Sequence, residues 1–394
     1  MVDLSIDFLD NSFKNPFWLS SAPPTRDAEH IKRAIKEGWG GAVIKTIGPD
    51  KIIRPDVRPR FAATKLMTEI FSFENIELIT DKKLIWWEQQ IRMLKELKMP
   101  IISSIMAGPE DEDWEYISKW AEEHGANILE MNVSCPHGEP EIKAGAFIGQ
   151  HPELIERYTK VVVNSVGCPV IVKLTPNVTD IVVCAEAALK GGAKAVTAIN
   201  TVLGINGVDI IRAIPYPNVE GFSTLGGHSG SAVKPIGLRM VAQIANSLGD
   251  KLLVSGCGGI SSWENAVEYI MLGATSTQVC TAVMIHGYEI VKKWITELER
   301  FMATHGYQNI AELRGKSLDH IKPLQELKVV PGIISQVDVD RCTDCGLCVI
   351  ACRDGAASAM KEPAKNSVDA DACIGCNLCR MVCPVNAIKM VNIG

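Results

Sequence analysis

Long apolar runs are missing from this 394-residue sequence, and so is an excess of positive charge. No uncharged apolar run reaches about 18 residues, which argues against a membrane-spanning helix. The net charge is −6 and there is no long basic stretch, so the electrostatic pattern of a nucleic-acid-binding protein is absent. The first residues, MVDLSIDFLDNSFKNP, include acidic side chains and lack the apolar stretch of a signal peptide. We therefore expect a soluble, cytoplasmic protein.

Cysteines are sparse over most of the chain and crowded near its end. Of thirteen, eight fall between residues 342 and 383. Because no secretory signal is evident, disulfides are not expected, and a dense cysteine cluster then points to metal. With 394 residues and 47% apolar composition, the chain can form a large domain with a sizeable core and a smaller second domain.

The crowded cysteines form two runs with the same spacing, C-x2-C-x2-C-x3-C. This segment of about fifty residues resembles the bacterial two-cluster ferredoxins, whose thiolates hold [4Fe-4S] clusters. In that family the fourth cysteine of each run binds the other cluster; Arg353 stands where a proline is common. The resemblance implies two ligand sets, which are Cys342, Cys345, Cys348 and Cys383 for one cluster and Cys352, Cys373, Cys376 and Cys379 for the other. A pair of zinc knuckles is the alternative, disfavoured by the register and by the lack of histidine among these cysteines.

Before the cysteine runs, short apolar segments alternate with amphipathic ones. The candidate strands are 16–22, 41–46, 101–106, 128–134, 170–175, 195–200, 252–256 and 276–280. Helical patterns between them include 28–38, 113–125, 153–167 and 263–273. This alternation predicts an α/β fold, a parallel (β/α)8 TIM barrel. A doubly wound open sheet is the alternative, but no Gly-x-Gly-x-x-Gly follows the first strand, which weakens a dinucleotide-binding interpretation.

Polar residues and glycines gather at the carboxyl ends of the predicted strands, where barrel enzymes carry their chemistry. Lys45, Lys173, Asn132 and Asn200 are costly at such positions unless they bind something polar. The segments 255–262 and 229–235 are Gly/Ser turns that precede helical patterns, and Thr281 follows the eighth strand. Phosphate binding near strands seven and eight is frequent in this fold, so these turns predict a phosphate site.

Taken together, the segments NVSCPHG, VKLTPNVTDI, AINTV, SGSAVKPIGLR and SGCGGISSWENA resemble the flavin domain of the dihydroorotate and dihydropyrimidine dehydrogenases. The likeness is nearest to the half of dihydropyrimidine dehydrogenase that carries flavin and the same ferredoxin tail. It implies FMN in the barrel mouth, held by Ser21, Ala22, Lys45, Thr46, Lys173, Gly230, Gly258, Gly259 and Thr281. It also implies that Asn132, Asn200 and Thr201 hydrogen-bond a pyrimidine substrate. Hydride would pass between the flavin and one carbon of a C=C bond, while a protein acid moves a proton at the neighbouring carbon.

The position of that acid departs from the resemblance. We expect the family's catalytic cysteine on the loop after SCPHG, directly before Gly-Gln, and Ile148 stands there. A pocket asparagine of the family is expected to correspond to Glu110. Glu110 is the first candidate for a replacement acid, because a carboxyl group in a flavin pocket can have its pKa raised. Weaker candidates are Glu139, Glu141 and His137, and Cys135 is assigned to the scaffold of the SCP turn.

Three functions remain open from the sequence. The first is an oxidoreductase that forms or reduces a C=C bond beside a carbonyl in a ring or acyl substrate other than uracil or thymine, with another residue as the acid. In the second, water or the substrate supplies the proton and Ile148 shapes an apolar pocket. The third is a flavin and iron–sulfur electron-transfer subunit with no small-molecule substrate, which the retained Asn132, Asn200 and Thr201 disfavour.

Partners and boundaries follow from the same patterns. No nicotinamide fingerprint occurs, so we expect electrons to pass through the clusters to a partner subunit that binds FAD and NAD(P), or to a ferredoxin. A homo- or hetero-oligomer is expected from the resemblance. The expected domains are a barrel over 1–305, a connector over 306–335 and a ferredoxin-like domain over 336–394.

Overall fold

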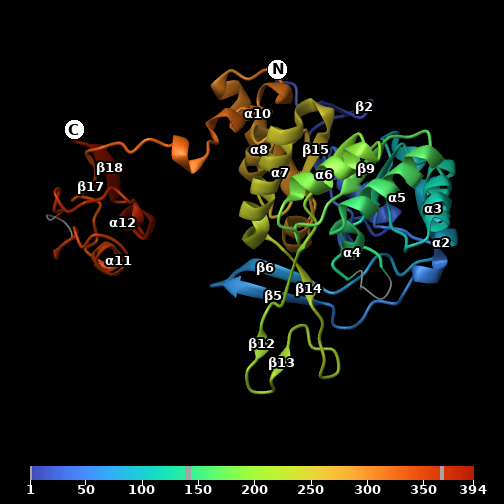
Figure 1. Cartoon of the computed structure of the whole chain (residues 1–394), viewed down its shortest axis with the longest axis horizontal. Coiled ribbons are helices and arrows are strands. Elements are labelled where there is room, and N and C mark those ends of the chain that lie inside the picture. The colour runs from blue at the N-terminus through green and yellow to red at the C-terminus, as the bar shows by residue number, and fades with distance from the viewer. Residues whose placement is uncertain (1, 138–142, 364–367) are drawn as a thin grey trace. The chain divides into compact units, whose positions relative to one another are not determined.

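A computed structural model describes residues 2–137, 143–363 and 368–394 (Figure 1). The chain divides into two compact units, Met1–His320 and Ile321–Gly394. In the described residues, no helix combines the length and the apolar character that crossing a bilayer requires.

The first unit is built on eight parallel strands whose spatial order follows the chain. They are β3 (Phe17–Leu19), β4 (Gly41–Ala42), β7 (Ile102–Ile105), β8 (Ile128–Asn132), β9 (Val170–Lys173), β10 (Ala195–Ala198), β15 (Leu253–Cys257) and β16 (Ser276–Val279). The residues after β4 close the ring, because Val43 and Ile47 form parallel bridges to Ile102 and Ile105 of β7. The predicted (β/α)8 barrel is confirmed.

Helices cover the outside of the barrel, one after each strand (Figure 1). They are α1 (Ala28–Glu37), α2 (Leu84–Leu94), α3 (Asp111–Glu123), α5 (Pro152–Ser165), α6 (Ile181–Lys190), α7 (Lys234–Leu248), α8 (Trp263–Met271) and α10 (Ile290–His305). Two short helices, α4 (Ala146–Gly149) and α9 (Thr281–His286), lie in the connections after β8 and β16. An N-terminal hairpin of β1 (Ile6–Phe8) and β2 (Asn11–Phe13) packs Phe8 and Phe13 against Trp18 of β3.

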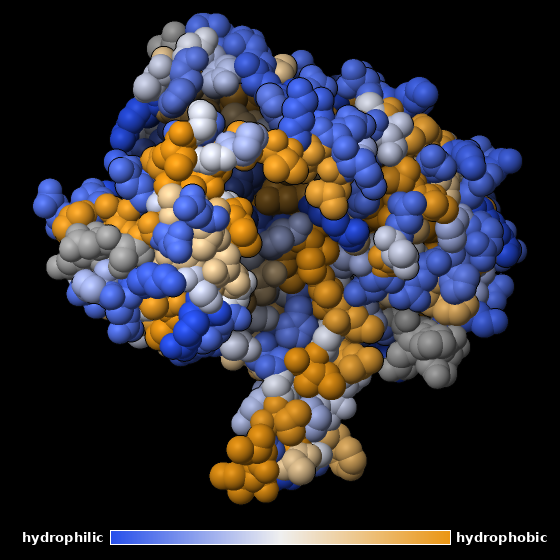
Figure 2. Space-filling view, turned by 60° about the vertical axis from the view of Figure 1, so that its left-hand side comes forward, coloured by the Kyte–Doolittle hydropathy of each residue, from blue (hydrophilic) through white to orange (hydrophobic). Residues whose placement is uncertain are grey.

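A second sheet, not predicted from the sequence, lies at the carboxyl ends of the barrel strands. It pairs β5 (Phe61–Leu66) and β6 (Glu69–Asn75), from the insertion after β4, with β11 (Val202–Gly204) and β14 (Gly226–Ser229), from the insertion after β10. We call this four-stranded antiparallel sheet the lid sheet. From it projects a hairpin of β12 (Val208–Asp209) and β13 (Ile214–Pro215), whose tip exposes Ile210 and Ile211 (Figures 1 and 2).

The second unit contains one antiparallel pair, β17 (Ile333–Val337) with β18 (Ile388–Asn392), and two helices, α11 (Leu347–Gly355) and α12 (Leu378–Met381). Its small buried core includes Cys348, Cys352, Cys379 and Ile388. Cysteines therefore occupy a large part of the interior, as expected for a domain too small to build an ordinary apolar core.

Candidate functional site

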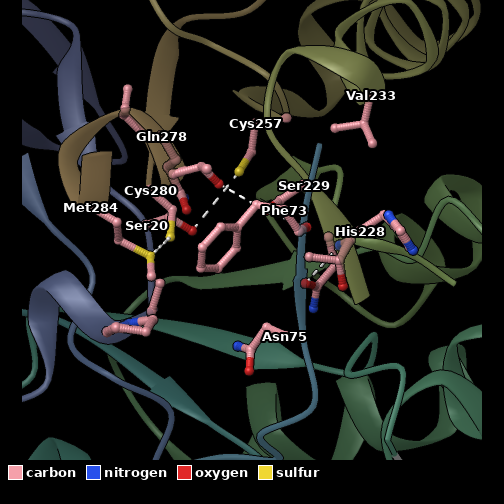
Figure 3. Close-up of a pocket in the computed structure, with 18 of the residues that line it drawn as sticks. Ser20, Phe73, Asn75, His228, Ser229, Val233, Cys257, Gln278, Cys280 and Met284 are labelled. Carbon is pink, nitrogen blue, oxygen red and sulfur yellow. Dashed lines mark hydrogen bonds between the residues drawn. The ribbon is translucent and has the colours of Figure 1, made fainter. Parts of the chain in front are cut away.

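A cavity of about 1200 Å³ lies between the carboxyl ends of the barrel strands and the lid sheet. Residues from the ends of every barrel strand except β7 contribute to it, together with Phe73 and Asn75 of β6. In Figure 3 the ring of Phe73 lies in the middle of the view, with Ser20, Cys257 and Cys280 on one side and Asn75 on the other. The lid sheet thus forms one wall of the cavity over the barrel mouth.

Two lysines enter this cavity, one following β4 and one at the end of β9. Lys45 is 9% exposed and Lys173 is 3% exposed. Lys45 forms an ion pair with Glu77, whose other carboxylate oxygen accepts a 2.8 Å hydrogen bond from Nε of Arg60. Burial acts to raise the pKa of Glu77, but Lys45 and Arg60 outweigh it and hold that pKa below its ordinary value. The carboxylate is therefore ionised, and it fixes the Lys45 ammonium at the cavity wall.

Lys173, at the end of β9, is held in place by two residues inside the barrel, Ser20 and Glu130. Its Nζ donates a 2.9 Å hydrogen bond to Oγ of Ser20 and lies 3.8 Å from Oε1 of the fully buried Glu130. Because a buried cation is costly without a counter-charge, Glu130 is what makes this position tenable.

The predicted substrate-binding residues lie together on one wall. Nδ2 of Asn132 donates to Oγ1 of Thr46 at 3.0 Å, and Nδ2 of Asn200 donates to Oγ of Ser134 at 2.9 Å. The backbone N–H of Thr201 donates to Oδ1 of Asn200 at 2.8 Å. These bonds fix the orientation of both amides, and the cavity is lined by Asn132, Asn200 and Thr201.

The predicted phosphate site is a set of glycine turns with unused donors. Gly230, Gly258 and Gly259 have φ values of +84°, +121° and +71° and line the cavity beside Thr281. Among the described residues, the backbone N–H groups of Gly230, Gly259 and Thr281 have no hydrogen-bond partner. A Cβ on Gly259 would lie 2.6 Å from the backbone nitrogen of Lys234, so only glycine fits there. Such an arrangement of free N–H groups suits an anion.

A thiol and an imidazole also reach this cavity. The Sγ of Cys135 donates to the carbonyl of Leu78 at 3.3 Å, and burial raises the pKa of this thiol to about 11. Burial lowers the pKa of His137 to about 4, and neither of its ring nitrogens has a partner among the described residues. At neutral pH the cavity therefore contains a protonated thiol and a neutral imidazole.

In the second unit the eight cysteines line two separate cavities. One, of about 320 Å³, is lined by Cys342, Cys345, Cys348 and Cys383. The other, of about 300 Å³, is lined by Cys352, Cys373, Cys376 and Cys379. In the described part of the chain, no three His, Cys, Asp or Glu side chains are close enough together to hold a single metal ion. Four thiols spread around a cavity suit a cluster better than one ion.

Comparison with known proteins decides the family. Residues 3–302 match the family described as dihydroorotate dehydrogenase, and residues 335–390 match the 4Fe-4S dicluster domain. The chain belongs to the dihydroorotate dehydrogenase family. It is an oxidoreductase of the dihydropyrimidine/dihydroorotate dehydrogenase type, which acts on CH–CH bonds.

Several named relatives cover most of this chain. It is 38% identical over 367 residues to the NAD-dependent dihydropyrimidine dehydrogenase subunit PreA of Escherichia coli (strain K12), covering 91% of this chain and 87% of that protein. It is 38% identical over 331 residues to the chloroplastic dihydropyrimidine dehydrogenase (NADP(+)) of Arabidopsis thaliana, covering 81% and 78%. The catalytic subunit of dihydroorotate dehydrogenase B (NAD(+)) of Pyrococcus abyssi is 34% identical over 317 residues, covering 80% and 99%.

The family implies FMN, and the barrel cavity meets its requirements on three counts. The unpartnered N–H groups of Gly230, Gly259 and Thr281 suit the phosphate. The buried Lys45 and Lys173 supply positive charge where a reduced flavin carries negative charge. The remaining expected contacts, Ser21, Ala22, Thr46 and Gly258, line the same cavity.

The structure places neither Ile148 nor Glu110, the two residues on which the sequence-based assignment of the acid depended, in the wall of the cavity. Ile148 is fully buried in the barrel core and does not line the cavity. Residues 146–149 form α4, and Gly149 lies so close to the Val133 carbonyl that a Cβ there would come within 2.2 Å of it. The chain is thus docked against the end of β8, with the Ile148 side chain in the core.

Glu110 is also outside the cavity. It is exposed at the N-terminus of α3, so burial does not act on its carboxyl group as expected. An amide does stand in the cavity at a position missed from the sequence, namely Asn75 of the lid sheet. Glu77 and Ser20 were missed as well, while Glu139 and Glu141 lie outside the described residues.

Proposed function

We propose that this chain binds FMN in the barrel cavity and two [4Fe-4S] clusters in the cysteine-lined cavities, and that it interconverts a pyrimidine-type ring and its 5,6-dihydro form. The observation that carries this proposal is one chamber that combines the amides of Asn132 and Asn200 with the protonated thiol of Cys135. A ring C=C bond beside a carbonyl needs both kinds of group. The amides bind the ring, and the thiol supplies a proton to one carbon.

FMN, when bound, accepts or delivers the hydride at the other carbon. Cys135 then acts as the acid when the ring is reduced, and its thiolate acts as the base when the dihydro ring is oxidised. Its position is held by the backbone, because the carbonyl of Cys135 accepts a 2.8 Å hydrogen bond from the N–H of Ala146.

The side chains of this chamber match an uncharged ring that alternates N–H and C=O groups. Asn75, Asn132 and Asn200 bring amides to the cavity wall, and an amide carries both donor and acceptor groups; the Glu77 carboxylate adds acceptor oxygens. The exclusion of uracil and thymine rested on the absence of an acid at position 148. With Cys135 proposed as the acid, that exclusion no longer applies, and both pyrimidines belong to the proposed substrate class.

Electrons are proposed to pass through the clusters to a separate nicotinamide-binding protein. The E. coli relative is named as a subunit of an NAD-dependent enzyme, and this sequence contains no Gly-x-Gly-x-x-Gly. A partner subunit that binds FAD and NAD(P), or a free ferredoxin, would complete the path.

The proposal is tested with the anaerobic full-length chain after its flavin has been reduced by dithionite. Uracil or thymine is expected to restore the absorbance of oxidised flavin at a rate typical of enzyme turnover and to yield the dihydropyrimidine. If neither pyrimidine nor any cyclic enone reoxidises the flavin while a ferredoxin or viologen does, the chain is an electron-transfer subunit and the proposal fails.

Substituting Gly259 by alanine is expected to weaken FMN binding by about tenfold or more. The new methyl group collides with the backbone of Lys234 and must displace the turn that offers its N–H groups, and a strained turn of this kind costs about 1–3 kcal/mol. The measurement is the dissociation constant of FMN by flavin fluorescence. Gly249→Ala is the matched control, because Gly249 also has positive φ (+53°) but no atom lies within 4 Å of the added Cβ. Equal FMN affinity in both variants would contradict the assignment.

A further inference from the structure

The two cysteine-lined cavities differ in what the same strand presents to them. Ser335 and Val337 of β17 are two residues apart and therefore share a face of the strand. Ser335 lines the cavity that contains Cys373, whereas Val337 lines the cavity that contains Cys342. One site thus has a hydroxyl group where the other has an isopropyl group.

The Ser335 hydroxyl is buried with sulfur as its only acceptor among the described residues. The side chain is 2% exposed, and its Oγ lies 3.9 Å from Sγ of Cys373 and 3.7 Å from Sδ of Met360. A cysteine that binds a cluster is a thiolate and has no proton, so the hydroxyl must be the donor in that bond. A charged thiolate is also a stronger acceptor than a neutral thioether, so cluster binding favours Cys373 over Met360.

We propose that Ser335 donates a hydrogen bond to the Cys373 thiolate and so raises the reduction potential of the cluster held by Cys352, Cys373, Cys376 and Cys379. The inference rests on the proposed function, in which both clusters are present. Reduction adds one electron to the cluster and its sulfur ligands, and a hydrogen bond to a ligand sulfur stabilises the more negative state. Ser335 binds no iron, so it acts by positioning a donor beside a ligand.

Main-chain donors reach the sulfurs of both cavities, and in the cavity that contains Cys373 they include Gly375 and Ser335. In the cavity that contains Cys342 the donors that the structure shows are main-chain groups. The backbone N–H groups of Asp344 and Ala387 donate to Sγ of Cys342 and Cys383 at 3.4 and 3.2 Å. These main-chain bonds survive any side-chain substitution. The quantity to compare is therefore the change in each cluster's reduction potential when a hydroxyl group is removed at Ser335 or added at Val337.

The test is a potentiometric titration of the anaerobically reconstituted full-length chain, followed by electron paramagnetic resonance. Ser335→Ala is expected to shift the reduction equilibrium of one cluster by about tenfold toward the oxidised form. For a one-electron couple that is a fall of about 59 mV, and the other cluster should keep its potential. Ser335→Thr retains the hydroxyl and should stay near the wild-type value. Val337→Ser places a hydroxyl group in the cavity that contains Cys342. It should raise the potential of the cluster in that cavity instead.

Iron content separates this inference from the proposed function. Wild-type chain that cannot be loaded with about eight iron atoms contradicts the cluster assignment itself. Fully loaded Ser335→Ala protein whose two potentials both match wild type, or both move equally, overturns only the role of Ser335.

Discussion

Replacing Cys135 by alanine is expected to lower the rate of pyrimidine reduction by about 10²–10⁴-fold, the usual contribution of a positioned proton donor. The thiol lines the cavity beside Asn132 and is held protonated by burial, so its loss removes the acid and leaves ring binding largely intact. The measurement is single-turnover reoxidation of reduced flavin by uracil. Reduction of the flavin by dithionite should be unaffected, because that step needs no proton donor to the substrate.

Two companion variants make this prediction specific. Cys184→Ala removes another buried thiol, one in α6 that does not line the cavity, and should retain the wild-type rate. Adding Ile148→Cys to Cys135→Ala should not restore activity, because the new thiol would lie in the core. If Ile148→Cys restored activity, position 148 would reach the substrate, and the acid would be assigned to the loop that carries this position.

The pH dependence should differ between the two directions of the reaction. With the pKa of Cys135 raised to about 11, the thiol stays protonated through pH 6–9, so ring reduction should show no loss from this group. Oxidation of the dihydro ring needs the thiolate, whose fraction rises about tenfold per pH unit below the pKa. Where proton abstraction limits turnover, the oxidation rate should therefore climb through pH 7–9, and a flat profile would exclude Cys135 as the base.

The barrel could be predicted from the sequence because each strand and helix carries its own local pattern. The predicted helix 153–167 and strand 128–134, for example, correspond to α5 and β8 within about two residues. The lid sheet could not be predicted, since it pairs β6 with β14 from two insertions far apart in the chain. In β6 the alternation is also misleading. Phe71 is exposed, whereas Ser72 and Glu74 are buried. Ser72 forms a hydrogen bond with Nδ1 of His228, and Glu74 accepts one from the N–H of Asn206.

Which of the acid candidates reaches the cavity could not be predicted from the sequence, because it depends on how the segments after β7 and β8 pack. Cys135 had the right chemistry, but only the docked turn of α4 shows that Ile148 points into the core and leaves the thiol at the cavity. The exposed position of Glu110 could have been predicted from the sequence. Asp111, Glu112 and Asp113 follow it, and acidic residues in a row mark the first turn of a helix, which places Glu110 at an exposed helix N-terminus.

Glu130 is the residue on which the interior of the barrel most depends. Its carboxylate is fully buried in β8, and Oε2 accepts hydrogen bonds from Oγ1 of Thr197 at 2.7 Å and Nε2 of Gln278 at 2.8 Å. Its other oxygen faces the Lys173 ammonium at 3.8 Å. Removing this carboxylate leaves a buried cation without a counter-charge and the Thr197 hydroxyl without its acceptor, while Gln278 keeps only its bond to Thr197.

Glu130→Ala is therefore expected to destabilise the barrel by about 3–5 kcal/mol, the cost of breaking a buried ion pair from one side. For a domain of this size that corresponds to a fall in Tm of about 6–10 °C. All eight tryptophans lie before residue 295, so tryptophan fluorescence follows the barrel unit and not the cysteine-rich unit. Glu130→Gln keeps an acceptor oxygen for Thr197 and Gln278 and should lose less. Adding Lys173→Met to Glu130→Gln should recover part of that loss, because it removes the stranded cation. If the double variant is no more stable than Glu130→Gln, the buried Lys173 cation is not destabilising without the Glu130 carboxylate, and the proposed dependence is wrong.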